Sequence, residues 1–357
     1  MSSANDTGQR PIVPTAAHGL GGDIPVVARA GRVHAALSVR SLLTAAAWTT
    51  AGLLALTALG RLVHLDDAVG WPYPGINALT PLVYLPAYAV LAVGFALRRN
   101  LLMVISGLLI VLHLFWTVPE LLPGSAEAAP AGSARLRVMT ANLLYHNDRA
   151  DRLGEQIRSG NPDLLVLAEV SPLTLERLRS SGALDDYRYS ETRPQVGAFG
   201  SAIFSRFPLT DAAAPEIAGQ QFLRATVQVD EQRRFVVYAV HTISPVNREY
   251  TEQWRAQLDT LREEVRAAEL PVVMAGDFNA TRDHRPFRRL TSAGVRDTHD
   301  VVGAGWTPTW NASSLSVLRL MRIDHVLASP AFAVTGYDVG DEFGSDHLPV
   351  TVDLALR

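Results

Sequence analysis

The sequence of 357 residues contains no cysteine and has few charged residues. The absence of cysteine excludes disulfides, thiolate metal ligands and a cysteine nucleophile, so oxygen or nitrogen atoms must hold any metal ion. Charged residues make up 19% of the chain, and the net charge of -3 provides no overall basic surface. Because electrostatic binding of nucleic acid needs such a surface, this balance disfavours nucleic acid as a partner without excluding it.

Apolar residues are concentrated before residue 123, in three runs. The runs are Leu42 to Gly60, Ile76 to Leu97 and Leu101 to Leu122, and their only charged residue is Glu120. About 20 apolar residues in a helix cross ~30 Å of hydrocarbon, so we predict three transmembrane helices, 42–60, 76–97 and 101–122. A cleaved signal peptide at the first run is disfavoured, because its preceding segment is too long and two further runs follow.

Two prolines, Pro81 and Pro86, interrupt the second run and would break a helix in a soluble protein. A membrane bundle tolerates them because neighbouring helices can satisfy the freed carbonyl groups. We therefore predict one helix across residues 76–97.

The charges that flank the runs predict the topology. One side carries Arg29, Arg32, Arg40, Arg98 and Arg99, and the other carries Asp66 and Asp67 with a single arginine, Arg61. The arginine-rich side is expected to be cytoplasmic. We therefore predict a multi-pass protein of the cell membrane with a disordered cytoplasmic tail at residues 1–41 and an extracytoplasmic domain after the third helix.

The remainder of the chain has the pattern of a mixed α/β domain. Residues 123–134 are rich in proline, glycine, alanine and serine, which suits a short exposed linker. Residues 135–357 then alternate β-rich runs with helical patterns. The predicted strands are 136–140, 164–167, 202–204, 235–240, 272–274, 326–328 and 350–354, and the predicted helices are 149–158, 173–179 and 248–268.

Polar and ionisable residues follow several of these strands or lie beside them, which is where an α/β fold can direct side chains into one cleft. They are Asn142, Glu169, His241, Asp277, Asn279, Asp324, Asp346 and His347. In this setting they form a candidate active site. Taken singly, several have ordinary alternatives, such as a turn at Asp277 and Asn279 or a helix start at Glu169.

The segments that carry these residues resemble the ordered motifs of the endonuclease/exonuclease/phosphatase family. They read TANLL (140–144), PDLLVLAEV (162–170), GSAIFSRFPL (200–209), VVYAVHT (236–242), VVMAGDFNAT (272–281), RIDHVLAS (322–329) and GSDHLPV (344–350). The resemblance covers residues 135–357 and implies a four-layered α/β sandwich with two packed β-sheets. Ala168 departs from the pattern, since many relatives have glutamine before the glutamate.

The resemblance also implies a metal site and a hydrolytic reaction. Glu169, with Asn142 and Asp346 nearby, resembles the metal site, and their oxygen atoms suit Mg²⁺ or Mn²⁺. Such an ion would neutralise charge on a phosphate.

The remaining five residues resemble the catalytic groups. Asp277 resembles the residue that orients or deprotonates the attacking water, and Asn279 resembles one that hydrogen-bonds the phosphoryl group. His347 with Asp324 resembles the family's His/Asp pair, and His241 its second histidine. The implied reaction is metal-assisted in-line hydrolysis without a covalent intermediate.

Other ionisable residues receive structural or peripheral roles. We expect His325 to be structural, and His64 and His113 to serve helix packing. Asp283, His284 and His299 are expected to be substrate-loop or surface residues.

The family cleaves several classes of phosphoester, so the motifs indicate the reaction and leave the substrate open. Three N-terminal spans before a domain of this type resemble the actinobacterial VanJ-type proteins associated with teicoplanin resistance. This resemblance implies hydrolysis of undecaprenyl pyrophosphate at the outer membrane face, with the lipid bilayer and a lipid-linked phosphate as partners and no obligate protein partner. An exported, anchored nuclease or other phosphodiesterase, and an inactive binding or signalling protein, are the alternatives.

Overall fold

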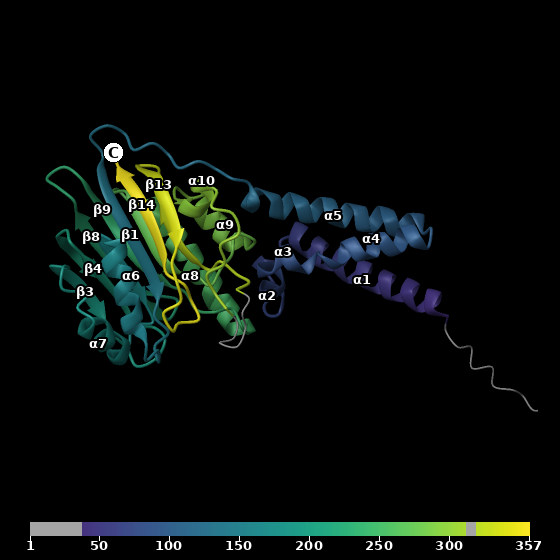
Figure 1. The fold of residues 1–357 in the computed structure, drawn as a ribbon, viewed down its shortest axis with the longest axis horizontal. Helices are drawn as coiled ribbons and strands as arrows, with labels where there is room; N and C mark the ends of the chain where they lie inside the picture. The colour runs from purple at the N-terminus through teal and green to yellow at the C-terminus, as the bar shows by residue number, and fades with distance from the viewer. Residues whose placement is uncertain (1–37, 312–318) are drawn as a thin grey trace, which may run out of the picture.

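The computed structural model describes residues 38–311 and 319–357, which form a bundle of apolar helices joined to a larger α/β unit (Figure 1). Most of the predicted tail, together with Arg29 and Arg32, lies outside the described residues.

The helical bundle, α1 to α5, consists of three long apolar segments and short connecting helices. Its elements are α1 (Val39–Leu62), η1 (Leu65–Asp67), α2 (Tyr73–Ala78), α3 (Thr80–Val83), α4 (Pro86–Ala96) and α5 (Asn100–Leu121). Val39–Leu62, Thr80–Leu97 and Asn100–Leu121 have mean hydropathies of 1.6, 1.7 and 2.4 and are long enough to cross a membrane. Their outward-facing side chains are also apolar, and Phe115 is 73% exposed. Such exposed apolar faces indicate association with a membrane.

The second apolar run differs from the single helix that the sequence predicts. Residues 76–78 belong to α2, and the run that could span a membrane begins at Thr80. A turn at Tyr84 and Leu85 separates α3 from α4. The turn lies directly before Pro86, which lacks a backbone N–H and disfavours helical geometry in the residue that precedes it.

Two six-stranded sheets form the centre of the α/β unit. The first has the order β13-β14-β1-β2-β4-β3, with β13 (Phe332–Val339), β14 (Val350–Leu356), β1 (Ala134–Asn142), β2 (Leu164–Ala168), β4 (Ser201–Ser205) and β3 (Tyr189–Arg193). The second has the order β11-β12-β10-β9-β8-β5, with β11 (Arg296–Asp297), β12 (Asp324–Ala328), β10 (Val272–Asp277), β9 (Arg234–His241), β8 (Leu223–Gln228) and β5 (Leu209–Ala213). A hairpin of β6 (Glu216–Ile217) and β7 (Gln220–Gln221) is separate.

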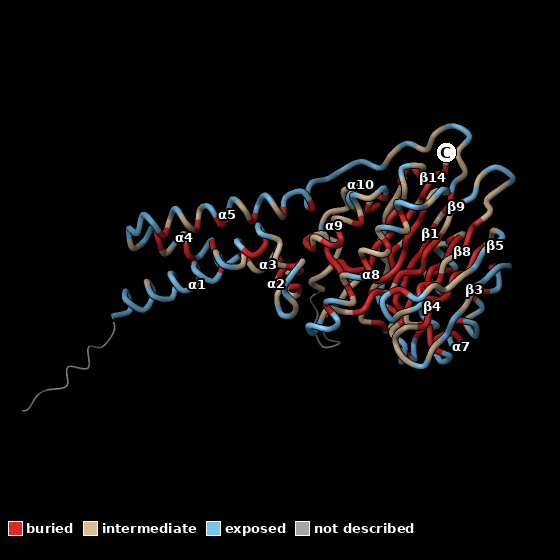
Figure 2. The backbone as a smooth tube through the Cα atoms, turned by 180° about the vertical axis from the view of Figure 1, so that it is seen from behind, coloured by how far each residue is buried: buried red, intermediate tan, exposed pale blue. Residues whose placement is uncertain are grey.

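The sheets pack face to face, and helices cover their outer faces. Buried aliphatic residues such as Val138, Val166 and Val273 fill the space between the sheets, where the tube in Figure 2 is mostly buried. The first sheet packs against α6 (Leu153–Gly160) and α7 (Pro172–Ser180), and the second against α8 (Arg248–Ala267) and α9 (Arg285–Thr291). The short helices η2 (Ala150–Arg152) and α10 (Thr298–Val302) complete the unit. This arrangement confirms the predicted four-layered sandwich.

The two units share a buried polar interface. Arg61, at the end of α1, forms an ion pair of 2.7 Å with Asp283 and donates to Asn77 Oδ1 at 2.9 Å. The Asn77 amide in turn donates to the carbonyl oxygen of Asp283 at 2.9 Å. His284 Nε2 lies 2.9 Å from the carbonyl oxygen of Pro74. The α/β unit is therefore held against the helical bundle by several hydrogen bonds and a buried ion pair.

This interface corrects the expectation for Asp283 and His284, which are only 3% and 2% exposed. Both were predicted to be substrate-loop or surface residues. The segment from η1 to α3 covers them, which excludes a surface position, and His284 also lines a cavity between the two units. The sequence pattern does not reveal this, because the covering segment is far away in the chain and folds back only in the tertiary structure.

The linker that follows α5 is largely exposed and contacts the α/β unit at Glu127 and at Gly132, whose carbonyl accepts a hydrogen bond from Arg233 at 2.6 Å. Glu127 forms two contacts with the guanidinium group of Arg296, at 2.7 and 3.0 Å, and accepts a hydrogen bond from the Val334 amide at 2.9 Å. Figure 1 shows the linker running along the α/β unit to β1, which begins at Ala134. The attachment limits how far the linker can move.

Candidate active site

Strand register brings the predicted site residues to one edge of the sandwich. Asn142 ends β1 and pairs with Ala168 of the parallel strand β2, directly before Glu169. In the second sheet Asp277, at the end of β10, pairs with both His241 on one side and Asp324 on the other. The polar ends of the central strands therefore meet, as the sequence pattern predicts.

Asn142 connects the site residues of the first sheet with those of the second sheet. Its Nδ2 donates to Glu169 Oε1 and to Asp277 Oδ2, both at 3.1 Å. Glu169 has a φ of 53°, in the left-handed region that non-glycine residues rarely adopt. The backbone amide of Tyr145 donates to Glu169 Oε2 at 3.1 Å. The two hydrogen bonds fix the position of the Glu169 carboxylate. Its backbone conformation is uncommon, and such conformations are typical of functional sites.

Asp277 lies at the centre of the site and is 2% exposed. Its Oδ1 accepts the amide N–H of Asn279 at 2.8 Å, and the Asn279 side chain donates to the carbonyl of Thr242 at 2.8 Å. Burial raises the pKa of Asp277 to about 6, although the nearby His347 favours its ionised form. A carboxylate with a pKa near neutrality suits proton transfer from water.

The glycine before Asp277 is required by the close packing of two strands. Gly276 has a φ of 140°, and a Cβ at this position would lie 1.9 Å from the carbonyl oxygen of Val240. No other residue fits at this position, so the Gly-Asp pair of the motif fixes where the carboxylate points.

His347 forms a buried charged pair with Asp324. Its Nδ1 lies 2.8 Å from Asp324 Oδ2, and the Thr309 hydroxyl donates to the same oxygen at 2.6 Å. Nε2 faces Asp277 Oδ2 at 3.7 Å and Asp346 Oδ1 at 3.9 Å. Burial alone would lower the pKa of His347, but the attraction of Asp324 and the other carboxylates raises it to about 10. The imidazole is therefore a cation at neutral pH, with its free N–H directed into the site.

His241 lies on the opposite side of Asp277. Its Nε2 is 3.7 Å from Asp277 Oδ2 and 3.8 Å from Glu169 Oε1, and its ring lies beside that of Phe199 with centroids 5.5 Å apart. The cluster thus combines several carboxylates with two imidazoles, a composition suited to holding a phosphate with its counterion and moving protons around it.

The donor atoms of the site fit a divalent metal ion. Asp324 Oδ1 and Asp346 Oδ1 are buried carboxylate oxygens without a hydrogen-bond partner among the described residues. Ligand atoms of Asp277, Asp324 and His347 lie within 4.8 Å of one another. This group differs from the predicted ligands Asn142, Glu169 and Asp346. The assignment of Asn142, Glu169 and Asp346 stays a prediction, since the contact with Asp324 occupies only Nδ1 of His347 and leaves Nε2 available.

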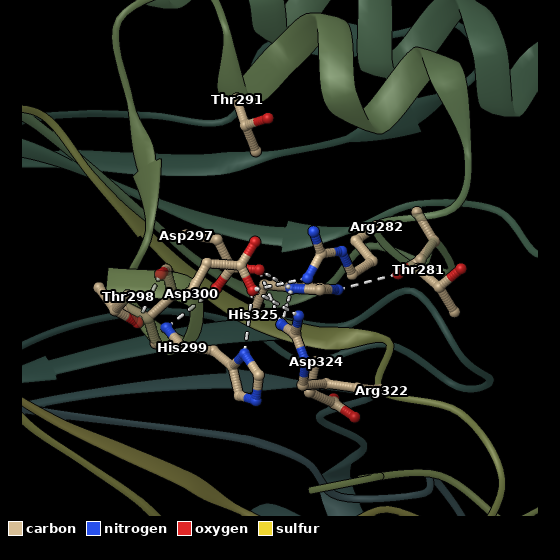
Figure 3. Close-up of polar contacts among 12 residues, drawn as sticks. Thr281, Arg282, Thr291, Asp297, Thr298, His299, Asp300, Arg322, Asp324 and His325 are labelled. Carbon is tan, nitrogen blue, oxygen red and sulfur yellow. Dashed lines mark hydrogen bonds and ion pairs between the residues drawn. The ribbon is translucent and has the colours of Figure 1, made fainter. Parts of the chain in front are cut away.

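A second buried network lies beside the site and has a structural role (Figure 3). Arg322 donates to Asp297 Oδ2 at 2.7 Å, and His325 Nδ1 lies 2.9 Å from the same oxygen. His325 Nε2 lies 2.9 Å from the carbonyl of Ala280, in agreement with its expected structural role. His299 is fully buried in the same region, and its Nδ1 lies 3.0 Å from Asp300 Oδ1. The prediction that His299 is a surface or substrate-loop residue was therefore wrong.

Two residues that contact the site were missed from the sequence. Thr309 binds Asp324, and Trp310 Nε1 donates to Asp346 Oδ2 at 3.0 Å. Trp310 also pairs with His347 through an isolated β-bridge. The segment around them has no strand periodicity and no charged residue, so only the tertiary fold reveals its position.

Comparison with known families agrees with this geometry. The sequence pattern of the Endonuclease/Exonuclease/phosphatase family matches residues 139–347, more than half of the chain. The chain belongs to this family. The matched segment contains all of the site residues described above, from Asn142 to His347.

Solved structures are similar to this chain, and two of the three described here reach a TM-score of 0.50 or more. A protein from Beutenbergia cavernae is 26% identical, with 62% of this chain and 72% of that chain covered and a TM-score of 0.49. A protein from Bacteroides vulgatus is 18% identical, with 63% and 100% covered and a TM-score of 0.52. The human Nocturnin catalytic domain with bound sulfate anion is 22% identical, with 62% and 95% covered and a TM-score of 0.50. No curated protein matches the chain.

Family membership and the acidic site together identify the reaction class. The protein is a metal-dependent phosphohydrolase of the endonuclease/exonuclease/phosphatase family. We predict Mg²⁺ or Mn²⁺ as its metal, because the predicted ligands are rich in oxygen.

Removal of divalent metal is expected to abolish hydrolysis, because the site contains no thiolate and its carboxylates need a cation to accept a phosphate. Phosphate release should fall to background after exhaustive chelation and return when Mg²⁺ or Mn²⁺ is added in excess. Full activity of the chelated protein would show that the reaction needs no metal.

Proposed function

We propose that the protein hydrolyses a phosphoester or pyrophosphate bond of a membrane lipid at the outer face of the cell membrane, and that its substrate is undecaprenyl pyrophosphate. The observation that carries this proposal is the buried interface between the α/β unit and the apolar helices, centred on the Arg61–Asp283 pair. With the helices in a bilayer, this contact keeps the catalytic unit at the membrane surface, where lipid phosphates are concentrated.

In the proposed reaction, the oxygen of a water molecule bonds to phosphorus while the bond between phosphorus and the leaving oxygen breaks, and Asp277 orients this water and accepts its proton. Asn279 and His241 donate hydrogen bonds to the phosphoryl oxygens, and the cationic His347 stabilises the charge that develops in the transition state. Asp324 holds the His347 ring through Nδ1, which leaves Nε2 directed at the phosphate. Glu169, Asn142 and Asp346 would hold a divalent cation, which would supply positive charge to offset the charge of the phosphate.

The resemblance to the VanJ-type proteins associated with teicoplanin resistance supports the choice of lipid. These proteins combine N-terminal spans with a catalytic domain of this family, and the described residues of this chain have the same order of elements. Hydrolysis of undecaprenyl pyrophosphate outside the cytoplasm would recycle the lipid that carries cell-wall precursors.

The experiment measures hydrolysis of a panel of substrates by the purified full-length protein in the presence of Mg²⁺ or Mn²⁺. Phosphate release is followed for the pyrophosphate, and the cleaved fragments are followed for the phosphodiesters. The panel contains undecaprenyl pyrophosphate in vesicles, single- and double-stranded DNA, RNA and sphingomyelin. The proposal predicts the highest kcat/KM for the lipid pyrophosphate. Preferred cleavage of DNA or RNA would identify an anchored nuclease, and no turnover with any member would favour a binding or signalling protein.

Topology gives a separate prediction. A reporter fused after Arg357 should be accessible outside the cell and one fused before Arg10 should be inside, because arginine-rich flanks stay in the cytoplasm. Protease added to intact protoplasts would then digest the catalytic domain. Complete protection of that domain would reverse the proposed orientation.

A further inference from the structure

A cavity of about 470 Å³ lies between the helical bundle and the α/β unit. Ile76, Leu79 and Val83 line it from α2, α3 and the residue that joins them, and Val246, Met321 and Ile323 line it from the α/β unit. Its volume lies within the range of ordinary ligand sites, roughly 300–1,000 Å³. Among the described residues, none that lines the cavity is Asp, Glu, Lys or Arg.

One end of this cavity adjoins the active site. Asn279 lines the cavity, and its backbone amide donates to Asp277 Oδ1. Trp310 also lines the cavity, and its indole N–H donates to Asp346 Oδ2. A ligand with a phosphate at Asp277 and Asp346 would therefore extend any attached chain directly into an apolar space.

The opposite wall lies at the beginning of an apolar helical segment. Leu79 and Val83 lie at the beginning of the apolar segment Thr80–Leu97, which is long enough to span a membrane. The chain of a membrane lipid is apolar along its whole length and would fill such a space, whereas a nucleic acid would bring further charged phosphates to a wall that carries no cationic side chain among the described residues.

We propose that this cavity binds the first part of the hydrocarbon chain of a lipid phosphate, next to the phosphate that the active site hydrolyses. The proposal rests on the proposed function and extends it. It assigns the selectivity for a lipid substrate to a cavity that the α/β unit shares with the connecting helices α2 and α3. Selectivity for a lipid then depends on chain length as well as on the phosphate.

A series of prenyl pyrophosphates tests the proposal with the full-length protein. The substrates are isopentenyl, geranyl and farnesyl pyrophosphate, with 5, 10 and 15 carbons. Burial of each methylene strengthens binding roughly fourfold. We therefore expect kcat/KM to rise by at least about tenfold from the first member to the last. The increase in kcat/KM per added carbon should become smaller once the chain fills the cavity.

Ile76→Asn and Val246→Asn should lower the ratio of kcat/KM for farnesyl to that for isopentenyl pyrophosphate by about tenfold, because each places an amide in the apolar wall. Val246 lies in a loop and is 53% exposed, so its substitution is compatible with folding even where Ile76→Asn is not. Leu173→Asn is the matched control, since Leu173 is 45% exposed on α7, in the outer layer that covers the other sheet, and the ratio should stay at the wild-type value.

Photocrosslinking with a farnesyl phosphate that carries a diazirine near its phosphate provides a readout independent of turnover. Labelled peptides should include residues 71–83 or 244–246. A flat chain-length profile, or labelling elsewhere, would overturn the cavity assignment while the protein remained a phosphohydrolase. Labelling of the cavity without hydrolysis of any prenyl pyrophosphate would retain the cavity and disprove the proposed reaction.

Discussion

Asp277→Ala is expected to reduce phosphate release by at least ~100-fold, because positioned proton-transfer groups contribute roughly 10²–10⁴-fold. Asp277 is buried at the centre of the site and lies within 4 Å of Asn142, His241 and His347. Glu169→Ala and His347→Ala should have effects of similar size, since they remove a predicted metal ligand and the cation of the site. The measurement is kcat/KM at saturating Mg²⁺ or Mn²⁺, together with circular dichroism to show that each variant is folded.

Asp338→Ala is the control for these substitutions, because Asp338 is an exposed carboxylate on β13, an edge strand that contributes no residue to the site. Its activity should equal that of the wild type. A folded Asp277→Ala protein with near-wild-type turnover would remove Asp277 from the mechanism, and the same result for Glu169→Ala would remove Glu169 from the metal site.

The second large effect is expected at the interface between the units. Arg61→Met leaves the buried Asp283 without its partner, and loss of one member of a buried ion pair costs about 3–5 kcal/mol. The side chains of Arg61 and Asp283 are only 9% and 5% exposed, so water does not replace the lost contact. We expect Arg61→Met to release the α/β unit from the helices, seen as faster limited proteolysis of the segment from Leu65 to Val83.

Arg248→Met is the matched control for Arg61→Met. Arg248 pairs with Glu252 on the surface of α8, where its side chain is 89% exposed. Such surface pairs contribute roughly 0–1 kcal/mol, so proteolysis should not change. The double variant Arg61→Met/Asp283→Asn should recover part of the loss, because it removes the uncompensated charge. Equal proteolysis of Arg61→Met and the wild type would show that the pair does not hold the units together.

The arrangement of the site could be predicted from sequence because its residues follow local patterns. Asn142, Glu169, His241 and Asp277 stand at the ends of β-rich runs, and a parallel register is enough to bring such positions to one edge. The predicted chemical role of each of these residues came from the resemblance to the family motifs. Strands such as β3 and β5 were missed, because their residues are mostly polar or exposed and show no apolar alternation.

The contact between the units could not be predicted in the same way. It joins residues more than 200 positions apart, such as Arg61 and Asp283, and no local period reports on such a pair. The same limit explains why the burial of His284 was not predicted, since the segment that covers it, around Pro74, is far away in the sequence. It also explains why Trp310 was missed, since its role depends on the position of Asp346 in the folded chain.

The central claim is tested most directly by phosphate release from undecaprenyl pyrophosphate embedded in vesicles that contain the full-length protein with its catalytic unit facing the added Mg²⁺ or Mn²⁺. The account predicts metal-dependent release by the wild type and at least ~100-fold slower release by Asp277→Ala. No release from this lipid by a metal-loaded wild-type protein that hydrolyses a soluble phosphodiester in the same vesicles would contradict it.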